Sequence, residues 1–217
     1  MNYTDFVYKK FRASEWESEV KTYIDNLSVP SNSIWYREDR DLKKASEELI
    51  TLGYYVKYKF GVVDSIQFCL NLSQDAVDGW ISRSGKQIES VQIVTAFYDT
   101  EEVEQDKLIM SGKESCPGGW EIDRFEALKA RVEQRIRNKV AKKYPKIDTL
   151  VVGIKDWFAR SVLENYSNLK EQLELTAKAL LRGSPFKELA IVDTDLVGRG
   201  GLWLIPLSET RLPDNTE

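Results

Sequence analysis

Apolar residues recur every three to four positions in four parts of the chain, which is the pattern of helices with one buried face. In the first part, Ser14 and Glu17 form a capping box around the stripe that begins at Trp16. Gly53 follows the second stripe and predicts the end of that helix. Pro145 ends the third. The predicted helices span about 15–27, 39–52, 120–144 and 157–182.

Between the second and third helices the pattern changes to alternation of apolar and polar residues, which is typical of strands. The alternation predicts strands within 54–60 and 66–70. The stretch 75–97 predicts two more strands, joined by a tight turn at Ser84-Gly85. Together these segments predict an antiparallel meander of three or four strands.

A continuous apolar run at 149–154 is typical of a strand that is buried on both faces of a sheet. It follows the helix at 120–144, and a strand reached through a helical crossover is expected to lie parallel to a strand already in the sheet. Two short apolar segments at 189–192 and 202–205 predict closing strands, arranged as a hairpin. The predicted fold class is therefore α/β, an α+β arrangement with a mixed sheet.

The chain has 217 residues, which fits a single domain with a sizeable core. We expect residues 1–38 to form an N-terminal helix and connector, 39–154 the core and 155–207 a C-terminal extension. Residues 208–217 are expected to form a tail. The polar stretch 98–118, within the range of the core, is open to three interpretations: a lid, a loop or a disordered segment.

The sequence contains no histidine. This excludes Ser-His-Asp and Cys-His catalysis, histidine general bases, HNH-type nucleases and most zinc sites. The cysteines, Cys69 and Cys116, form no CxxC pair, so a reduced pair is favoured over a disulfide between them. The absence of a secretory signal and of an apolar run of about 18 residues predicts a cytoplasmic protein that does not enter a membrane.

Charge is distributed unevenly along the chain. The net charge of −4 argues against a general nucleic-acid binder. In the segment 129–146, however, eight lysines and arginines stand against Glu133 alone. A helix with this composition could bind the phosphates of a nucleic-acid backbone, and its candidate contacts are Arg135, Lys139 and Lys142. A homodimer or a partner protein could explain the acidic overall charge.

Two carboxylates fall on the adjacent strands of 75–97. Asp78 lies on the first strand and Glu89 in the middle of the second, and both have apolar neighbours. A carboxylate is costly to bury in a sheet unless it is paired or binds a metal. Glu89 must therefore pair with a cation, such as Lys86 or an arginine of the basic helix, or bind a divalent metal. With no histidine and no phosphate-binding glycine loop, the available groups suit Mg²⁺ or Mn²⁺ chemistry.

The order helix, antiparallel meander, helix, strand resembles the PD-(D/E)XK, or restriction-endonuclease-like, superfamily over residues 39–154. Its members bind magnesium through an Asp on one strand and an Asp or Glu on the next, and a Lys two residues later helps to activate water. A glutamate on the preceding helix often joins them. The resemblance implies that Asp78 in AVDGWI and Glu89 in QIESVQIV bind the metal and that Glu48 is the helix glutamate.

The sequence departs from this pattern at the lysine. Val91 occupies that position, and Gln92 is the nearest polar substitute. Strand alternation places Gln92 on the face opposite Glu89 unless a bulge intervenes. A glutamine can orient a water molecule but cannot supply the charge of a lysine, so activity could be reduced or lost. A second alignment, in which Asp64 of GVVDSI is the first carboxylate, resembles RecB-type nucleases but lacks their later Asp-Tyr-Lys element.

Three functions follow from these observations. The first is a metal-dependent nuclease-like protein, with Glu48, Asp78, Glu89 and Gln92 as its catalytic residues. The second is a non-catalytic interaction or adaptor subunit on the same fold, for instance in a phage or mobile-element system, and the valine at position 91 favours it. The third is a carboxylate-pair hydrolase such as a glycosidase, which lacks an evident aromatic sugar cleft.

Overall fold

A mixed β-sheet forms the centre of the computed structural model, which describes residues 3–25, 45–71, 77–96, 121–142, 144–154, 167–194 and 202–206. Seven strands in these ranges lie side by side in the order of the sequence. They are β1 (Phe11–Arg12), β2 (Ile66–Leu70), β3 (Gly79–Arg83), β4 (Lys86–Thr95), β5 (Ile147–Ile154), β6 (Phe186–Asp193) and β7 (Leu202–Pro206). Strands β1 to β4 are antiparallel, β4 to β6 are parallel, and β7 is antiparallel to β6. The α/β class with a mixed sheet is confirmed.

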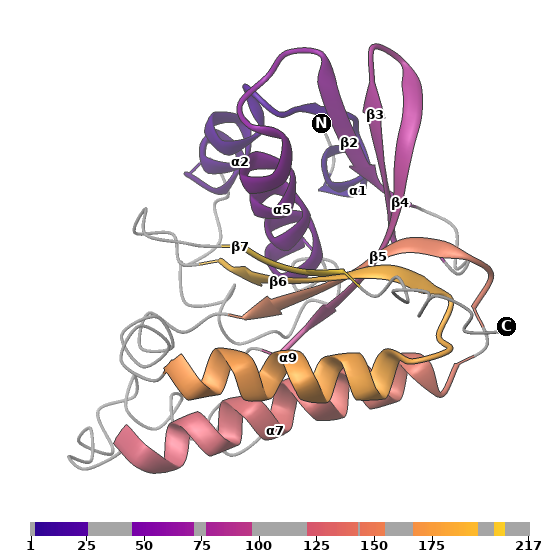
Figure 1. Ribbon diagram of the computed structural model, residues 1–217. Coiled ribbons are helices and arrows are strands. Elements are labelled where there is room, and N and C mark those ends of the chain that lie inside the picture. The colour runs from indigo at the N-terminus through magenta and orange to yellow at the C-terminus, as the bar shows by residue number, and fades with distance from the viewer. Residues whose placement is uncertain are drawn as a thin grey trace, which may run out of the picture.

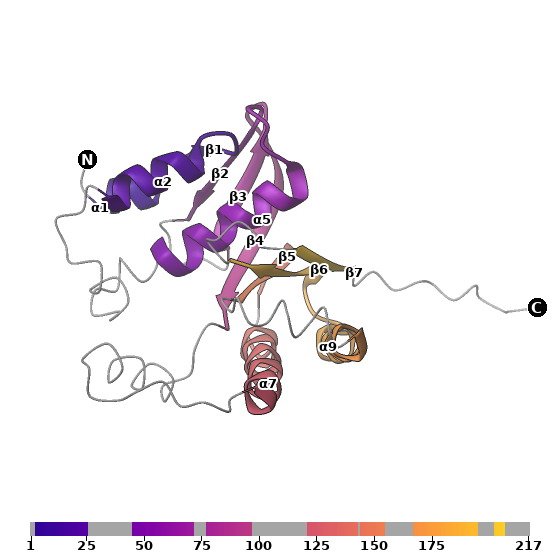
Figure 2. The same ribbon diagram turned by 90° about the vertical axis from the view of Figure 1, so that its left-hand side faces the viewer.

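Helices cover both faces of this sheet (Figures 1 and 2). One layer contains α1 (Tyr3–Val7), α2 (Trp16–Asp25) and α5 (Ile50–Phe60), which continues from the π-helical turn η1 (Ala45–Leu49). The other contains α7 (Glu121–Val140) and α9 (Ser167–Leu181). Two separate clusters of buried side chains reflect these two layers. The predictions of the first, third and fourth helices are confirmed over these bounds.

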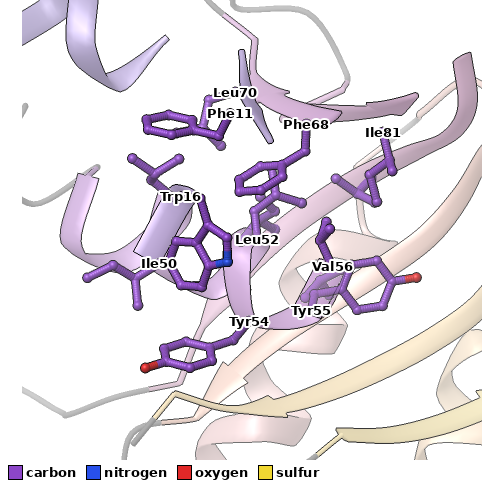
Figure 3. Packing of buried hydrophobic residues seen from close by; sticks show 14 of the residues in the cluster. Phe11, Trp16, Ile50, Leu52, Tyr54, Tyr55, Val56, Phe68, Leu70 and Ile81 are labelled. Carbon is purple, nitrogen blue, oxygen red and sulfur yellow. The ribbon is translucent and has the colours of Figure 1, made fainter. Parts of the chain in front are cut away.

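The core on the α5 side is rich in aromatic rings (Figure 3). The indole of Trp16 packs edge-on against Tyr54 at a centroid distance of 5.2 Å and against Phe68 at 6.1 Å. Gly53 makes this packing possible, since a Cβ atom there would lie 2.6 Å from the indole ring. The glycine is thus a point of close contact between α2 and α5, and not the end of a helix.

The prediction of a strand at 54–60 is wrong, because these residues continue α5 to Phe60. All side chains from Ile50 to Val56 are buried, so this part of the helix has no polar face to produce a helical period. The helix ends instead at Gly61, whose φ of 79° favours glycine and whose N–H donates to the carbonyl of Lys57. The meander therefore consists of three strands, β2 to β4.

The core on the α7 side of the sheet and the pairing of strands β5 to β7 agree with the predictions for these segments. Leu128, Val132 and Ile136 of α7 are buried against the sheet, as their spacing predicts. Strand β5 is parallel to β4 and to β6, which confirms the crossover. The closing strands β6 and β7 pair as predicted.

Other predictions concern residues outside the described ranges. These are the polar stretch 98–118, the first part of the helix at 157–182, the turn between β6 and β7, the side chain of Cys116 and the tail at 208–217. Cys69, on β2, is a free cysteine. No helix within the described ranges has the length and apolar character needed to cross a membrane.

The hairpin β3–β4 contains a shift in strand register, which decides the face of the sheet to which its side chains point. Ser84 and Gly85 both have positive φ, as a two-residue hairpin turn requires, so the predicted turn is confirmed. Beyond the turn, Ser82 pairs with Gln87, but Ile81 pairs with Glu89. Ile88 is therefore an extra residue on β4, a β-bulge that shifts the register by one position.

Candidate functional site

Asp78 lies immediately before β3, at the point where that strand stops pairing with β4. Its carboxylate oxygen Oδ2 accepts a hydrogen bond from the N–H of Ile93 at 2.8 Å. The same oxygen accepts from the Lys139 ammonium of α7 at 3.2 Å. The backbone contact satisfies a donor of β4 that has lost its strand partner, so the carboxylate is fixed in place independently of the lysine.

Gln92 joins Asp78 on this side of the sheet. Its side chain is almost fully buried, and its Oε1 accepts a hydrogen bond from the Lys139 ammonium. The ammonium also lies 5.9 Å from the centre of the Tyr144 ring. Burial, and then the negative charge of Asp78, raise the pKa of Tyr144. We call the three side chains Asp78, Gln92 and Lys139 the α7-side cluster.

Glu89 lies on the opposite face of the sheet, towards α5. Its Oε1 accepts hydrogen bonds from the hydroxyls of Tyr55 and Thr149 and from the Lys59 ammonium, the last at 3.2 Å. The same ammonium contacts Glu188 of β6 at 2.6 Å. Burial, followed by the charge of Glu89, raises the pKa of Tyr55 far above its usual value. We call these residues the α5-side cluster.

The expected pairing of Glu89 with a cation is therefore present, but the cation is Lys59 and not Lys86 or an arginine of α7. Sequence reasoning missed Lys59 and Tyr55 because it assigned both to a strand. The signal was the buried carboxylate itself, which needs a cationic partner from a neighbouring element when Lys86 of its own hairpin does not supply one.

The structure does not bring Asp78 and Glu89 together. An uninterrupted register from the turn would pair Glu89 with Trp80 and Asp78 with Val91, so that both carboxylates shared one face. The bulge at Ile88 moves Glu89 opposite Ile81 instead, which reverses its face. Gln92 then takes the place beside Asp78. Among the described residues, no group of three or more Cys, Asp or Glu side chains is arranged to hold a metal ion.

The remaining acidic candidates lie elsewhere. Glu48 is half-buried in η1, and its neighbour Glu47 accepts a hydrogen bond from Thr95 at the end of β4. Asp64 is exposed in the loop between α5 and β2.

A further polar group on the α7 side was not expected from the sequence. Asp148, at the start of β5, accepts hydrogen bonds from the N–H and the hydroxyl of Ser90 and from Lys187. Burial raises the pKa of Asp148, but these donors outweigh burial and hold it below its usual value. The interaction ties β4 to β5 and β6 and satisfies all three side chains.

Beside the α7-side cluster lies a stripe of positive charge on α7. Arg135 and Lys139 are four residues apart in α7, so they share one side of the helix, and Lys142 lies in the turn that follows the end of α7 at Val140. Arg135 and Lys142 are exposed and make no side-chain ion pair with any residue of the described ranges. We call these three residues the basic stripe. Lys129, which contacts Gln172 of α9, lies on a different flank.

Comparison with protein-family models, with curated proteins and with solved structures gave no match. Function is therefore inferred from the site itself. In that site, a fixed carboxylate and a buried amide present hard oxygen atoms, and an ammonium and a guanidinium next to them suit phosphate.

Proposed function

We propose that this chain is a nuclease-like protein that binds the phosphodiester backbone of a nucleic acid and that its hydrolytic activity is reduced or lost. The observation that carries the proposal is the convergence of Asp78, Gln92 and Lys139 beside two exposed cations, Arg135 of the same helix and Lys142 of the turn that follows it. Phosphate groups bound by the basic stripe would lie next to the oxygen atoms of the cluster.

The order of elements supports this proposal. Helix α5, the antiparallel strands β2 to β4, helix α7 and the parallel strand β5 follow one another as the resemblance to the restriction-endonuclease-like superfamily implies. In that arrangement, the end of the hairpin next to the crossover helix is where Asp78 and Lys139 meet.

A divalent metal fits part of this site. The carboxylate of Asp78 and the side-chain oxygen of Gln92 are hard donors of the kind that Mg²⁺ prefers, and Mg²⁺ commonly takes its other ligands from water and phosphate. Glu89 does not fit, because its carboxylate lies on the other face and is held by Lys59. A bound metal would polarise a phosphoryl oxygen and lower the pKa of a water molecule.

The residues of this chain explain why hydrolysis would be weak. Only one carboxylate, Asp78, is present in the α7-side cluster, and it forms an ion pair with Lys139. Val91, at the position of the missing lysine, is fully buried on the α5 side and cannot reach this site. The amide of Gln92 can form hydrogen bonds with water, but it cannot take a proton from water as a general base at neutral pH.

Fluorescence anisotropy with labelled single- and double-stranded DNA and RNA, measured across a range of salt concentrations, tests the proposal. We expect the double variant Arg135→Gln/Lys142→Gln to bind more weakly and to lower the slope of log K against log salt by about 2. Arg137→Gln is the control for position: it removes one positive charge, against two in the double variant, from an exposed site about 200° round the helix from Arg135. Equal binding by all three proteins, or no binding to any nucleic acid, would refute the proposal.

Cleavage is measured on the same substrates with Mg²⁺ or Mn²⁺, for the wild type and for Asp78→Asn. We expect cleavage to be slow or undetectable in the wild type, and any activity that is present should require Asp78. Activity that survives Asp78→Asn would show that hydrolysis takes place at a site other than the α7-side cluster.

One observation favours the alternative, a non-catalytic interaction subunit. The second predicted carboxylate is fully engaged by the α5-side cluster, and the exposed apolar residues Val62, Val63 and Ile88 lie near the tip of the β3–β4 hairpin. A binding experiment that is negative for every nucleic acid would favour this alternative. The glycosidase hypothesis gains no support, because Asp78 and Glu89 on opposite faces could not flank one glycosidic bond.

A further inference from the structure

The ammonium of Lys139 lies between the two side-chain oxygen atoms of the α7-side cluster. It contacts Asp78 Oδ2 at 3.2 Å and also contacts Gln92 Oε1. These two oxygen atoms are the hard donors of the α7-side cluster. The side chain of Lys139 is 15% exposed and that of Asp78 is 23% exposed, so water screens this contact only in part.

We propose that Lys139 acts as an internal cation that keeps divalent metal out of the Asp78–Gln92 pair until a bound phosphate draws the ammonium away. This inference rests on the proposed function for the identity of the phosphate ligand, a nucleic-acid backbone. An ammonium and a divalent ion cannot share the same two oxygen atoms, since each would repel the other at contact distance. Metal binding therefore requires the lysine side chain to move.

The lysine can move because of its place in α7. Its side chain is a flexible four-carbon chain with a compact charge, so the ammonium can turn from one anion to another. Arg135 lies one helical turn before Lys139 on the same side of α7, and Lys142 follows in the turn after the helix, where its N–H donates to the carbonyl of Lys139. A phosphate held by these two exposed residues would be a neighbouring anion for Lys139.

The oxygen atoms would keep their positions after the lysine leaves. The N–H of Ile93 holds Asp78 Oδ2 at 2.8 Å without any help from the lysine. Gln92 is 2% exposed, so its side chain has little freedom to turn away. The pair is thus already arranged for a cation, and the charge of Lys139 decides which cation it receives.

Isothermal titration calorimetry with MnCl₂ alone tests the first half of the proposal. We expect weak or undetectable binding by the wild type and at least tenfold tighter binding by Lys139→Met. The gain should disappear in Lys139→Met/Asp78→Asn, and Lys139→Arg should behave like the wild type because it keeps the charge. Lys139→Gln is the second uncharged variant, and thermal melting verifies that each protein is folded. Equal Mn²⁺ affinity in the wild type and both uncharged variants would overturn the proposal.

A second titration tests the role of phosphate. The thymidine dinucleotide TpT, which has a single phosphodiester, should tighten Mn²⁺ binding by the wild type, and Mn²⁺ should tighten TpT binding by the same factor. In Lys139→Met, TpT should tighten Mn²⁺ binding less than it does in the wild type. Tightening of equal size in both proteins would overturn the exchange mechanism.

The two proposals can fail separately. If the basic-stripe variants bind nucleic acid like the wild type while Lys139→Met gains Mn²⁺ affinity, the exclusion of metal by Lys139 stands and the nucleic-acid function falls. If nucleic-acid binding depends on the basic stripe but Lys139→Met gains no Mn²⁺ affinity, the proposed function stands and the inference about Lys139 is overturned.

Discussion

Replacing Lys59 by methionine is the perturbation whose effect the structure defines most clearly. The ammonium of Lys59 lies 2.6 Å from Glu188, 2.7 Å from the hydroxyl of Tyr55 and 3.2 Å from Glu89. The substitution keeps the length and the apolar stem of the side chain but removes its charge. Glu89 and Glu188 would then lie close together without the cation between them, and the side chain of Glu89 is only 8% exposed.

The expected cost follows from this geometry. Removing one partner of a buried ion pair costs about 3–5 kcal/mol, because the other charge stays buried. The side chain of Lys59 is 21% exposed, so we expect the lower end of that range, about 3 kcal/mol. For a chain of this size, that loss corresponds to a decrease in Tm of roughly 6–12 °C.

Lys187→Met is the matched control. Like Lys59, Lys187 forms an ion pair with a carboxylate of the sheet, in this case Asp148, but the side chain of Lys187 is 56% exposed. An exposed ion pair contributes about 0–1 kcal/mol, so the control should lose at most that amount. Urea denaturation followed by tryptophan fluorescence gives the free energy of unfolding of each protein.

A double variant identifies the cause of the loss. If the uncompensated charge of Glu89 is responsible, Lys59→Met/Glu89→Gln should be more stable than Lys59→Met alone, because glutamine carries no charge and can still accept the hydroxyl hydrogen bonds. A loss in Lys59→Met no larger than that of Lys187→Met, or no recovery in the double variant, would refute the reasoning.

Three further predictions concern single positions. Gly53→Ala should destabilise the protein by about 1–3 kcal/mol in urea denaturation, despite the higher helix propensity of alanine, because its Cβ would collide with the buried ring of Trp16; an unchanged midpoint would contradict the packing. Tyr55→Phe should cost about 1–2 kcal/mol by the same measurement, since Glu89 loses one donor but keeps two others. The lowered pKa of Asp148 means that its carboxylate stabilises the fold above its unfolded pKa of about 3.9 and that this contribution is lost as the pH falls below it. Asp148→Asn should therefore be less stable than the wild type at pH 7, and the difference should become smaller as the pH falls below that value; a constant difference would contradict this.

Most of the fold could be predicted from local patterns. The stripe of Leu128, Val132 and Ile136 faces one buried environment, so its helical period is clear, and the continuous apolar run of β5 indicates a strand that is buried on both faces. Residues 54–60 could not be assigned in this way. The aromatic residues of α5 contact α2 on one side and the sheet on another, and a helix that is buried on several sides shows no helical period.

The candidate site was predictable only in part. Asp78, Gln92 and Lys139 were each named from the sequence, and the structure joins them in one cluster. Their grouping could not be predicted, because it depends on the register of one hairpin. Gly85 belongs to the turn, and the segment from Lys86 to Glu89 contains no glycine or proline that indicates a bulge at Ile88.

This bulge has a consequence for both faces of β4. A single extra residue sends Glu89 towards α5, where Lys59 neutralises it, and sends Gln92 towards α7, where Asp78 and Lys139 are. With the regular register, two carboxylates would face α7 and the buried charge between α5 and the sheet would be absent.

The same register shift therefore supplies an ion pair that holds α5 to β4 and β6 and removes a carboxylate from the α7 side. A site that keeps only one carboxylate has a weak hold on a divalent metal, and the positive charge of Lys139 can then compete with the metal for that carboxylate. The stability of the α5 layer and the low activity expected of the α7-side cluster thus have one structural origin.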